Sequence, residues 1–85
     1  MTFSISFSDY ASKELEKLDN SIKIQIMNKI KDLESNPNLG KGLSYARKHQ
    51  RKLYVGKYRV LYSVLERNIV VIKISHRKTA YTWRK

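Results

Sequence analysis

The stretch KLYVGKYRVLYSV (residues 52–64) decides the fold of this chain. Two runs that alternate apolar and polar residues flank Gly56-Lys57, and this pattern predicts two strands joined by a two-residue hairpin turn. A third strand-like run, IVVIKIS (residues 69–75), follows residues 66–68, for which a three-residue turn is expected. The second half of the chain is therefore expected to form three antiparallel strands.

The first half of the chain predicts one strand and two helices. TFSISF (residues 2–7) alternates apolar and polar residues, as a half-buried strand does. Residues 8–18 and 19–36 carry apolar side chains at helical spacing, and each segment opens on residues that cap helices. The second helix should end before Pro37, because proline disfavours helix in the residue before it. The expected fold is α+β with the order β-α-α-β-β-β, an antiparallel sheet with a helical hairpin packed on one face.

Charge is divided unevenly along the chain. The 85 residues, which are expected to form a single domain (residues 1–85), carry a net charge of +11. Residues 1–40 hold five Lys/Arg and six Asp/Glu, whereas residues 41–85 hold thirteen Lys/Arg and one acid. Charge confined to one half favours a surface that binds a polyanion such as nucleic acid.

The sequence gives no sign of export or membrane insertion. No apolar run approaches the roughly 18 residues of a spanning helix, and the N-terminus lacks the basic lead and apolar stretch of a signal peptide. The absence of cysteine excludes disulfides and thiolate metal sites. A cytoplasmic protein without membrane contact is expected, and no metal or cofactor is expected either.

The expected pairing of the strands separates an apolar face from a basic one. In this register Val55 pairs with Tyr58, and Leu65 pairs with Ile69. A one-residue slip at either turn would bury a cation, which is unfavourable. The apolar face then carries Leu53, Val55, Val60, Tyr62, Val64, Val70, Ile72 and Ile74. The basic face carries Lys52, Tyr54, Arg59, Leu61, Lys73, Ser75 and, by continued alternation, Arg77.

Such a basic face has groups suited to breaking RNA. Cleavage requires a deprotonated 2′-hydroxyl, stabilised charge on the phosphoryl oxygens and a protonated 5′-oxygen. Arg59 and Arg77 suit the second task, because guanidinium groups bind phosphate oxygens in bidentate fashion and stay charged. A lysine such as Lys52 can move a proton if neighbouring cations lower its pKa. Tyr81 can fold back over the same end of the sheet and stack on a base or orient the 2′-hydroxyl.

His76 is a possible catalytic residue, since it is the only side chain of this cluster with an ordinary pKa near neutrality. It falls on the core side of its strand, which favours a packed histidine over a general base. Tyr54, Tyr58 and Tyr62 are ordinary strand residues, and they are not expected to form a base-stacking platform. Further contacts to RNA are expected from Arg47, Lys48, Arg51, Tyr54, Lys57, Lys73 and Lys78.

KLYVGKYRVLYSV, followed by IVVIKISHRKTAY (residues 69–81), resembles the RelE/ParE superfamily of bacterial and archaeal toxins. The likeness extends over nearly the whole chain and implies a RelE-like fold. RelE-type members are messenger-RNA endonucleases that act in the ribosomal A site and are silenced by a cognate antitoxin. The resemblance therefore implies a RelB-like antitoxin, the ribosome and mRNA as partners. It also implies catalytic roles for Lys52, Arg59, Arg77 and Tyr81.

Three functions remain open at this point. The four residues together favour a ribosome-dependent, metal-independent mRNA endonuclease that cleaves by attack of the 2′-hydroxyl, with the general acid and general base unassigned. A ParE-type member would instead inhibit DNA gyrase and would be no enzyme. The third alternative is a non-catalytic nucleic-acid-binding module whose basic sheet only positions phosphates.

Overall fold

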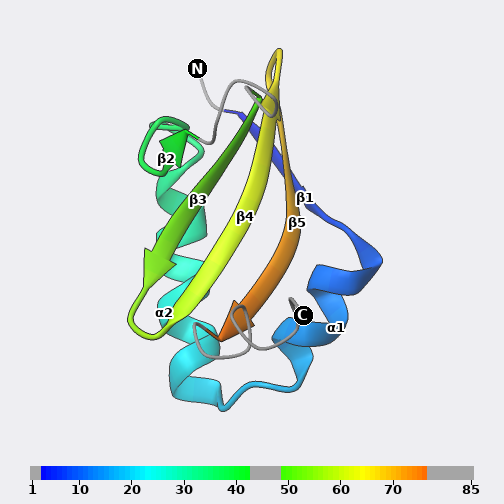
Figure 1. The fold of residues 1–85 in the computed structure, drawn as a ribbon, viewed down its shortest axis with the longest axis vertical. Coiled ribbons are helices and arrows are strands. Elements are labelled where there is room, and N and C mark those ends of the chain that lie inside the picture. Colours follow the sequence, from blue (N-terminus) through cyan, green and yellow to red (C-terminus); the bar gives the residue numbers. More distant parts are fainter. Residues whose placement is uncertain (1–2, 43–48, 77–85) are drawn as a thin grey trace, which may run out of the picture.

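Two helices and one five-stranded sheet make up the structure, a computed structural model that describes residues 3–42 and 49–76 (Figure 1). The elements in chain order are β1 (Ser4–Phe7), α1 (Asp9–Glu16), α2 (Asn20–Asp32), β2 (Lys41–Gly42), β3 (Gln50–Val55), β4 (Tyr58–Leu65) and β5 (Asn68–His76). The strand order in the sheet is β1-β5-β4-β3-β2. The predicted α+β class is confirmed.

The sheet differs from the expected arrangement at both edges. Strands β2 to β5 pair antiparallel, but β1 runs parallel to β5. A parallel pair requires a long connection, and here both helices and three strands lie between the two partners. The short β2 falls within a turn-rich segment where the sequence predicts no strand.

Ser8 fixes the start of α1 against β5. Its hydroxyl oxygen accepts a hydrogen bond from Ala11 N at 3.0 Å, so Ser8 is the cap that the sequence predicts at the start of this segment. The same hydroxyl donates to Ile72 O at 2.7 Å, and Ser8 N donates to Val71 O at 2.9 Å. Helix α1 therefore lies beside β5, which it contacts together with β1 (Figure 1).

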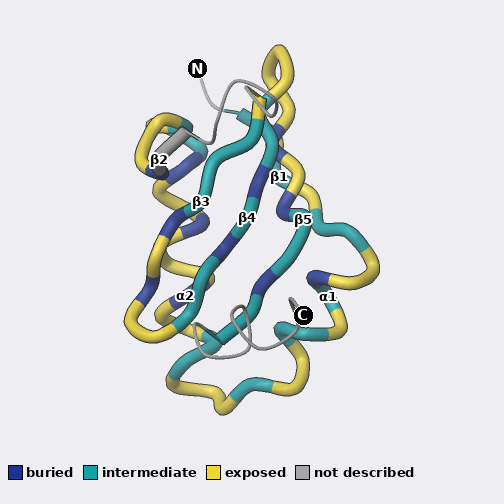
Figure 2. The backbone as a smooth tube through the Cα atoms, viewed as in Figure 1, coloured by how far each residue is buried: buried dark blue, intermediate teal, exposed yellow. Residues whose placement is uncertain are grey.

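The core lies between the two helices and the sheet (Figure 2). Helix α2 ends at Asp32, a few residues earlier than expected, and Leu33 caps it. Each aliphatic side chain that becomes fully buried contributes roughly 1.5–3 kcal/mol. The buried apolar residues are Ala11, Ile26, Ile30, Leu33, Leu53, Val55, Val60, Tyr62, Ile69, Val71 and Ile74.

The β3–β4 hairpin has the predicted turn and register. Val55 pairs with Tyr58 and Lys52 pairs with Leu61, so two residues form the turn. Gly56 has a φ of 59°, a left-handed conformation that glycine adopts without the steric penalty of a side chain. This hairpin is therefore specified by its own local sequence.

The β4–β5 turn is shorter than predicted. Leu65 pairs with Asn68, where the sequence predicts a pair with Ile69, so the turn has two residues and not three. Glu66 in this turn has a φ of 57°. A left-handed conformation costs a residue with a side chain roughly 1–2 kcal/mol, and local preference therefore favours a longer turn than the one that forms.

A β-bulge farther along β5 restores the predicted pairing. Tyr62 pairs with Val71 and Leu61 pairs with Lys73, which leaves Ile72 as the extra residue. The extra residue changes which side of the sheet each later side chain faces. Lys73 consequently lies on the side opposite to Val71, although the two are separated by one residue.

The shorter turn also changes which residues of β5 are buried. The predicted core positions of Val70 and Ile72 are wrong, since Val70 is 36% exposed and Ile72 is only half-buried. Ile69 and Val71 are buried in their place. Beyond the bulge the predicted alternation holds again, with Ile74 in the core.

Candidate nucleic-acid interface

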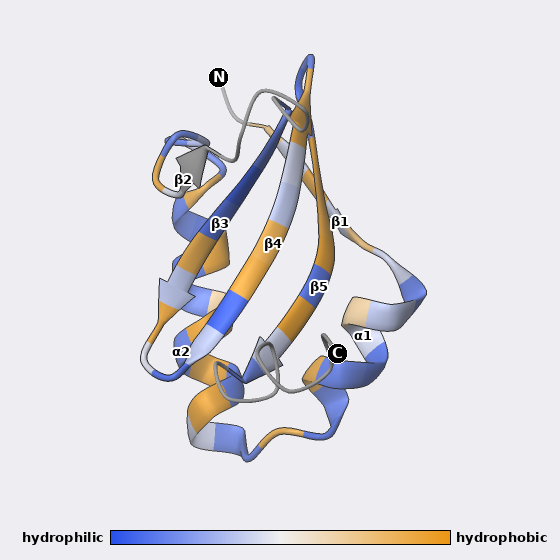
Figure 3. Ribbon diagram, in the orientation of Figure 1, coloured by the Kyte–Doolittle hydropathy of each residue, from blue (hydrophilic) through white to orange (hydrophobic). Residues whose placement is uncertain are grey.

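The sheet face turned away from α2, called the outer face here, presents polar and basic side chains in two neighbouring rows. Residues within a row are paired across β3, β4 and β5, whose spacing is roughly 4.8 Å. Figure 3 shows hydrophilic segments on these three strands between hydrophobic ones. The rows are Lys52, Leu61 and Lys73, and Tyr54, Arg59 and Ser75.

Tyr54 lies close to two cations of the outer face. The Nζ of Lys52 is 5.9 Å from the centroid of its ring, and the Cζ of Arg59 is 5.7 Å from it. Burial alone would raise the pKa of Tyr54, but the charges of Arg59 and Lys52 and their hydrogen bonds to the phenol lower it below its ordinary value. The ring is 44% exposed, so it offers a flat surface beside two positive charges.

Among the described residues, Arg59 has a donor without an acceptor. Its Nε is buried and finds no hydrogen-bond partner within the described part of the chain. Leaving a buried donor unpaired costs about 1–3 kcal/mol. A phosphate oxygen is a strong acceptor for a guanidinium group, which can bind it through Nε and a terminal nitrogen together.

His76 lies away from this cluster. It pairs with Tyr58 across β4 and β5, and the two rings meet edge to face with centroids 5.1 Å apart. Both residues fall on the side of the sheet that carries Val60 and Ile74, as the sequence predicts for His76. The structure therefore does not bring this imidazole together with Lys52 on the outer face.

Arg51 also faces the inner side, where it belongs to a hydrogen-bonded anchor that sequence reasoning missed. Its Nη1 donates to Gly40 O at 2.7 Å. The hydroxyl of buried Tyr62 accepts from Gly40 N at 2.9 Å and donates to Pro37 O at 2.8 Å. A Cβ at Gly40 would lie 2.7 Å from Lys52 O, so only glycine fits there. This anchor ties the segment after α2 to side chains of β3 and β4.

The anchor affects the acidity of its tyrosine. Burial raises the pKa of Tyr62, although the hydrogen bond with Gly40 and the charge of Arg51 act in the opposite direction. Tyr54 and Tyr62, eight positions apart in the chain, are therefore shifted in opposite directions by their surroundings.

The remaining predicted contacts divide into two groups. Lys57 is exposed in the β3–β4 turn, at the tip of the hairpin, and Lys73 lies in the outer-face row with Lys52. The other predicted site residues lie outside the described ranges; they are Arg47, Lys48, Arg77, Lys78 and Tyr81.

Tyr10 is a neighbour of the outer face that sequence reasoning missed. The Nζ of Lys73 lies 6.0 Å from the centroid of its ring. No motif in the sequence signals this contact, because it depends on where α1 packs against β5.

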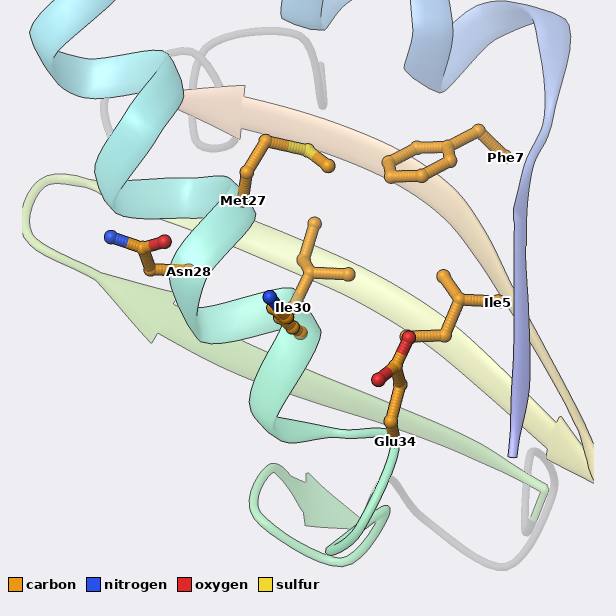
Figure 4. Close-up of a pocket in the computed structure, with 7 residues that line it drawn as sticks. Ile5, Phe7, Met27, Asn28, Ile30 and Glu34 are labelled. Carbon is orange, nitrogen blue, oxygen red and sulfur yellow. The ribbon is translucent and has the colours of Figure 1, made fainter. Parts of the chain in front are cut away.

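A pocket of about 320 Å³ opens on the helix side of the sheet, between β1 and α2 (Figure 4). Ile5 and Phe7 from β1 and Met27 and Ile30 from α2 supply its apolar walls. Its lining is mainly apolar and it is separate from the basic outer face.

Two further classes of feature are absent from residues 3–42 and 49–76. These residues contain no group of three or more His, Asp or Glu side chains that could hold a metal ion. Neither of the two described helices is long and apolar enough to cross a membrane.

The family that this sequence matches consists of small toxins from type II toxin–antitoxin systems. The family described as "ParE toxin of type II toxin-antitoxin system, parDE" matches residues 5–81. The chain belongs to this RelE/ParE toxin superfamily. A search of curated protein sequences finds no match.

Solved structures share the fold. A chain of the toxin–antitoxin complex RelBE2 from Mycobacterium tuberculosis is 25% identical, with a TM-score of 0.80 over 91% of this chain and 100% of that one. A mutant of E. coli toxin RelE in the free state is 20% identical, with a TM-score of 0.80 over 94% and 88%. A chain of the chromosomal ParDE system from P. aeruginosa is 16% identical, with a TM-score of 0.69 over 88% and 96%. RelE and ParDE structures thus share the fold, which therefore does not separate the two activities.

Proposed function

We propose that this toxin is an mRNA endonuclease that acts in the ribosomal A site and needs no metal ion. The observation that carries the proposal is the position of Tyr54 beside both Lys52 and Arg59 on an open sheet face. Two cations supply phosphate contacts and the ring supplies a surface for a base. The Nε of Arg59, which has no hydrogen-bond partner among the described residues, adds a donor that a phosphate oxygen can satisfy when the side chain turns toward it.

In the proposed reaction the messenger lies across the outer face. The 2′-oxygen attacks the adjacent phosphorus, the bond to the 5′-oxygen breaks, and the products are a 2′,3′-cyclic phosphate and a 5′-hydroxyl. One group of the site takes the proton of the 2′-hydroxyl and another gives a proton to the leaving oxygen. Arg59 and Arg77 stabilise the additional charge of the transition state.

Two further residues complete the proposed catalytic set. Lys52 transfers a proton beside the phosphate, and Tyr81 stacks on a base or orients the 2′-hydroxyl. The roles of Arg77 and Tyr81 rest on the family resemblance of the sequence. We assign no proton transfer to His76, because its ring packs against Tyr58 on the inner side of the sheet.

The proposal includes a cognate RelB-like antitoxin as partner, in the cytoplasm. Similar solved chains come from the toxin–antitoxin complex RelBE2 of Mycobacterium tuberculosis and from the RelE-RelB complex of Pyrococcus horikoshii. An antitoxin that masks the outer face should be acidic or amphipathic, since it must offset the charge of that face.

A translation reaction programmed with one defined messenger tests the proposal. The 5′ ends of the messenger are mapped by primer extension with and without the purified toxin, with and without ribosomes, and in EDTA. Cuts inside translated codons that require ribosomes and persist in EDTA are expected. Loss of all cleavage in EDTA would contradict metal independence.

The second candidate function is inhibition of DNA gyrase. It is favoured by the description of the matching family, which names the ParE toxin, and by the structural likeness to a ParDE chain. An intact messenger in the translation reaction, together with blocked supercoiling by gyrase, would establish this function in place of the nuclease.

A further inference from the structure

Tyr10 is a large aromatic side chain that the hydrophobic core does not use. It lies in the first turn of α1, its side chain is 51% exposed, and it is absent from the residues packed against the core. The ammonium group of Lys73 lies 6.0 Å from its ring centroid. An exposed ring beside a cation is thus placed next to the basic outer face.

Three features of the fold bring Tyr10 and Lys73 together. The bulge at Ile72 turns Lys73 outward, although without it the alternation from Val71 would place that side chain inside. The carbonyl oxygens of Val71 and Ile72 accept hydrogen bonds from Ser8. Ser8 caps α1, so the irregular part of β5 also sets the start of the helix that carries Tyr10.

The pair repeats the arrangement around Tyr54 at the opposite end of the same row. Lys52, Leu61 and Lys73 are paired across β3, β4 and β5, with Tyr54 beside Lys52 and Tyr10 beside Lys73. The outer strands of this row, β3 and β5, are roughly 10 Å apart. A single strand of nucleic acid that lies across the row can reach both rings.

We infer that Tyr10 and Lys73 form a second contact position for single-stranded RNA, at the β5 edge of the outer face. A nucleobase stacks on the exposed side of the Tyr10 ring, and Lys73 contacts a neighbouring phosphate. Stacking on an aromatic side chain tolerates every base, because each has a π face. The inference rests on the proposed function for RNA as the ligand and adds a residue of α1 to its binding surface.

Fluorescence anisotropy with a labelled 2′-O-methyl octaribonucleotide tests this contact. The 2′-O-methyl sugars remove the attacking hydroxyl, so binding is measured without cleavage. Tyr10→Leu keeps an apolar side chain but removes the π face, and it should weaken binding about tenfold. Tyr10→Phe keeps the ring and should bind within about twofold of the wild type.

Charge is tested separately with a matched pair of lysines. Lys73→Gln should reduce the slope of log affinity against log salt by about 0.7, the value for one phosphate of a single strand. Lys29→Gln removes the same charge from an exposed position on α2, on the other side of the sheet, and should leave the slope unchanged. Thermal unfolding of each variant checks that the fold is kept. Tyr10→Phe is the folded protein with which Tyr10→Leu is compared.

The outcomes separate this inference from the nuclease proposal. If Tyr10→Leu binds and cuts as the wild type does, or if the wild type does not bind the oligonucleotide, the contact position is overturned. If binding depends on Tyr10 while every messenger stays intact on ribosomes, the nuclease proposal fails and the contact position stands.

Discussion

Tyr54 and Arg59 face each other across β3 and β4, and the Cζ of Arg59 lies 5.7 Å from the centroid of the Tyr54 ring. Lys52 adds a second cation to the same ring. All three residues belong to one hairpin, so its register alone determines that they meet. The centre of the candidate site is therefore built by the most local part of the sheet.

The first prediction concerns the role of the Tyr54 ring. If it provides a stacking surface, Tyr54→Phe should keep the cleavage rate within about threefold and Tyr54→Ala should lower it about tenfold. Val70→Ala shortens an exposed side chain of β5 on the same face of the sheet, and it should leave the cleavage rate unchanged. The rates are measured at one defined codon in a purified translation reaction. A Phe variant as impaired as the Ala variant would instead show that the hydroxyl takes part in the chemistry.

This hairpin is also where sequence reasoning works best. Alternation of side chains and a glycine at the turn both act locally, so they predict the pairing of Lys52 with Leu61 and of Tyr54 with Arg59, and the structure confirms both pairs. The placement of Lys52, Tyr54 and Arg59 on one face follows from those pairs.

The β4–β5 turn and bulge could not be predicted, because they compensate for each other. A turn shorter by one residue and an extra residue at Ile72 leave Leu61 opposite Lys73, as in the predicted register. Both arrangements keep Lys73 out of the core, so the cost of burying charge does not distinguish them. Besides the length of the turn, they differ in which apolar residues of β5 are buried.

Contacts between distant segments were also beyond prediction. The bond of Tyr62 to Pro37 and the contact of Tyr10 with Lys73 depend on how a loop and a helix pack on the sheet. No local pattern in the sequence encodes either contact.

The second prediction concerns the anchor formed by Tyr62. Tyr62→Phe leaves Gly40 N and Pro37 O without their partner and should lower the free energy of unfolding by about 1–3 kcal/mol. Tyr10→Phe removes a hydroxyl from an exposed tyrosine and should change the free energy of unfolding by less than about 0.5 kcal/mol. Urea unfolding of both variants measures the difference. Equal stability of the two variants would contradict a structural role for the Tyr62 hydroxyl.

The third prediction concerns pH. The raised pKa of Tyr62 means that the folded state keeps this proton to higher pH than the unfolded state does. Its stabilisation is therefore complete below the ordinary tyrosine pKa of about 10 and is lost as pH rises through the raised pKa. The lowered pKa of Tyr54 acts in the opposite sense. The contribution of Tyr54 to folding stability is lost as pH falls through its lowered pKa.

Urea unfolding from about pH 8 to about pH 11 compares the wild type with Tyr62→Phe. The stability difference between them should shrink as pH rises above about 10. A difference that stays constant over this range would show that Tyr62 does not titrate in this way.

The fourth prediction concerns the link between α1 and β5. Ser8→Ala removes the helix cap and the hydrogen bond to Ile72 O, and it should lower the free energy of unfolding by about 1–2 kcal/mol. Ser12→Ala, inside the same helix, should change it by less than about 0.5 kcal/mol. Thermal and urea unfolding measure both variants. If the two variants lose a similar free energy of unfolding, Ser8 does not fix the start of α1.

The central claim is that the guanidinium group of Arg59 stabilises the cleavage transition state. Its most direct test is the rate at which one translated codon is cut on ribosomes by the wild type, Arg59→Ala and Arg67→Ala. Arg67 is a matched control, because it is an exposed arginine in the β4–β5 turn, near the ring of Phe3. We expect Arg59→Ala to cut at least about 100-fold more slowly and Arg67→Ala to cut at the wild-type rate. A folded Arg59→Ala protein that cuts as fast as the wild type would contradict the claim.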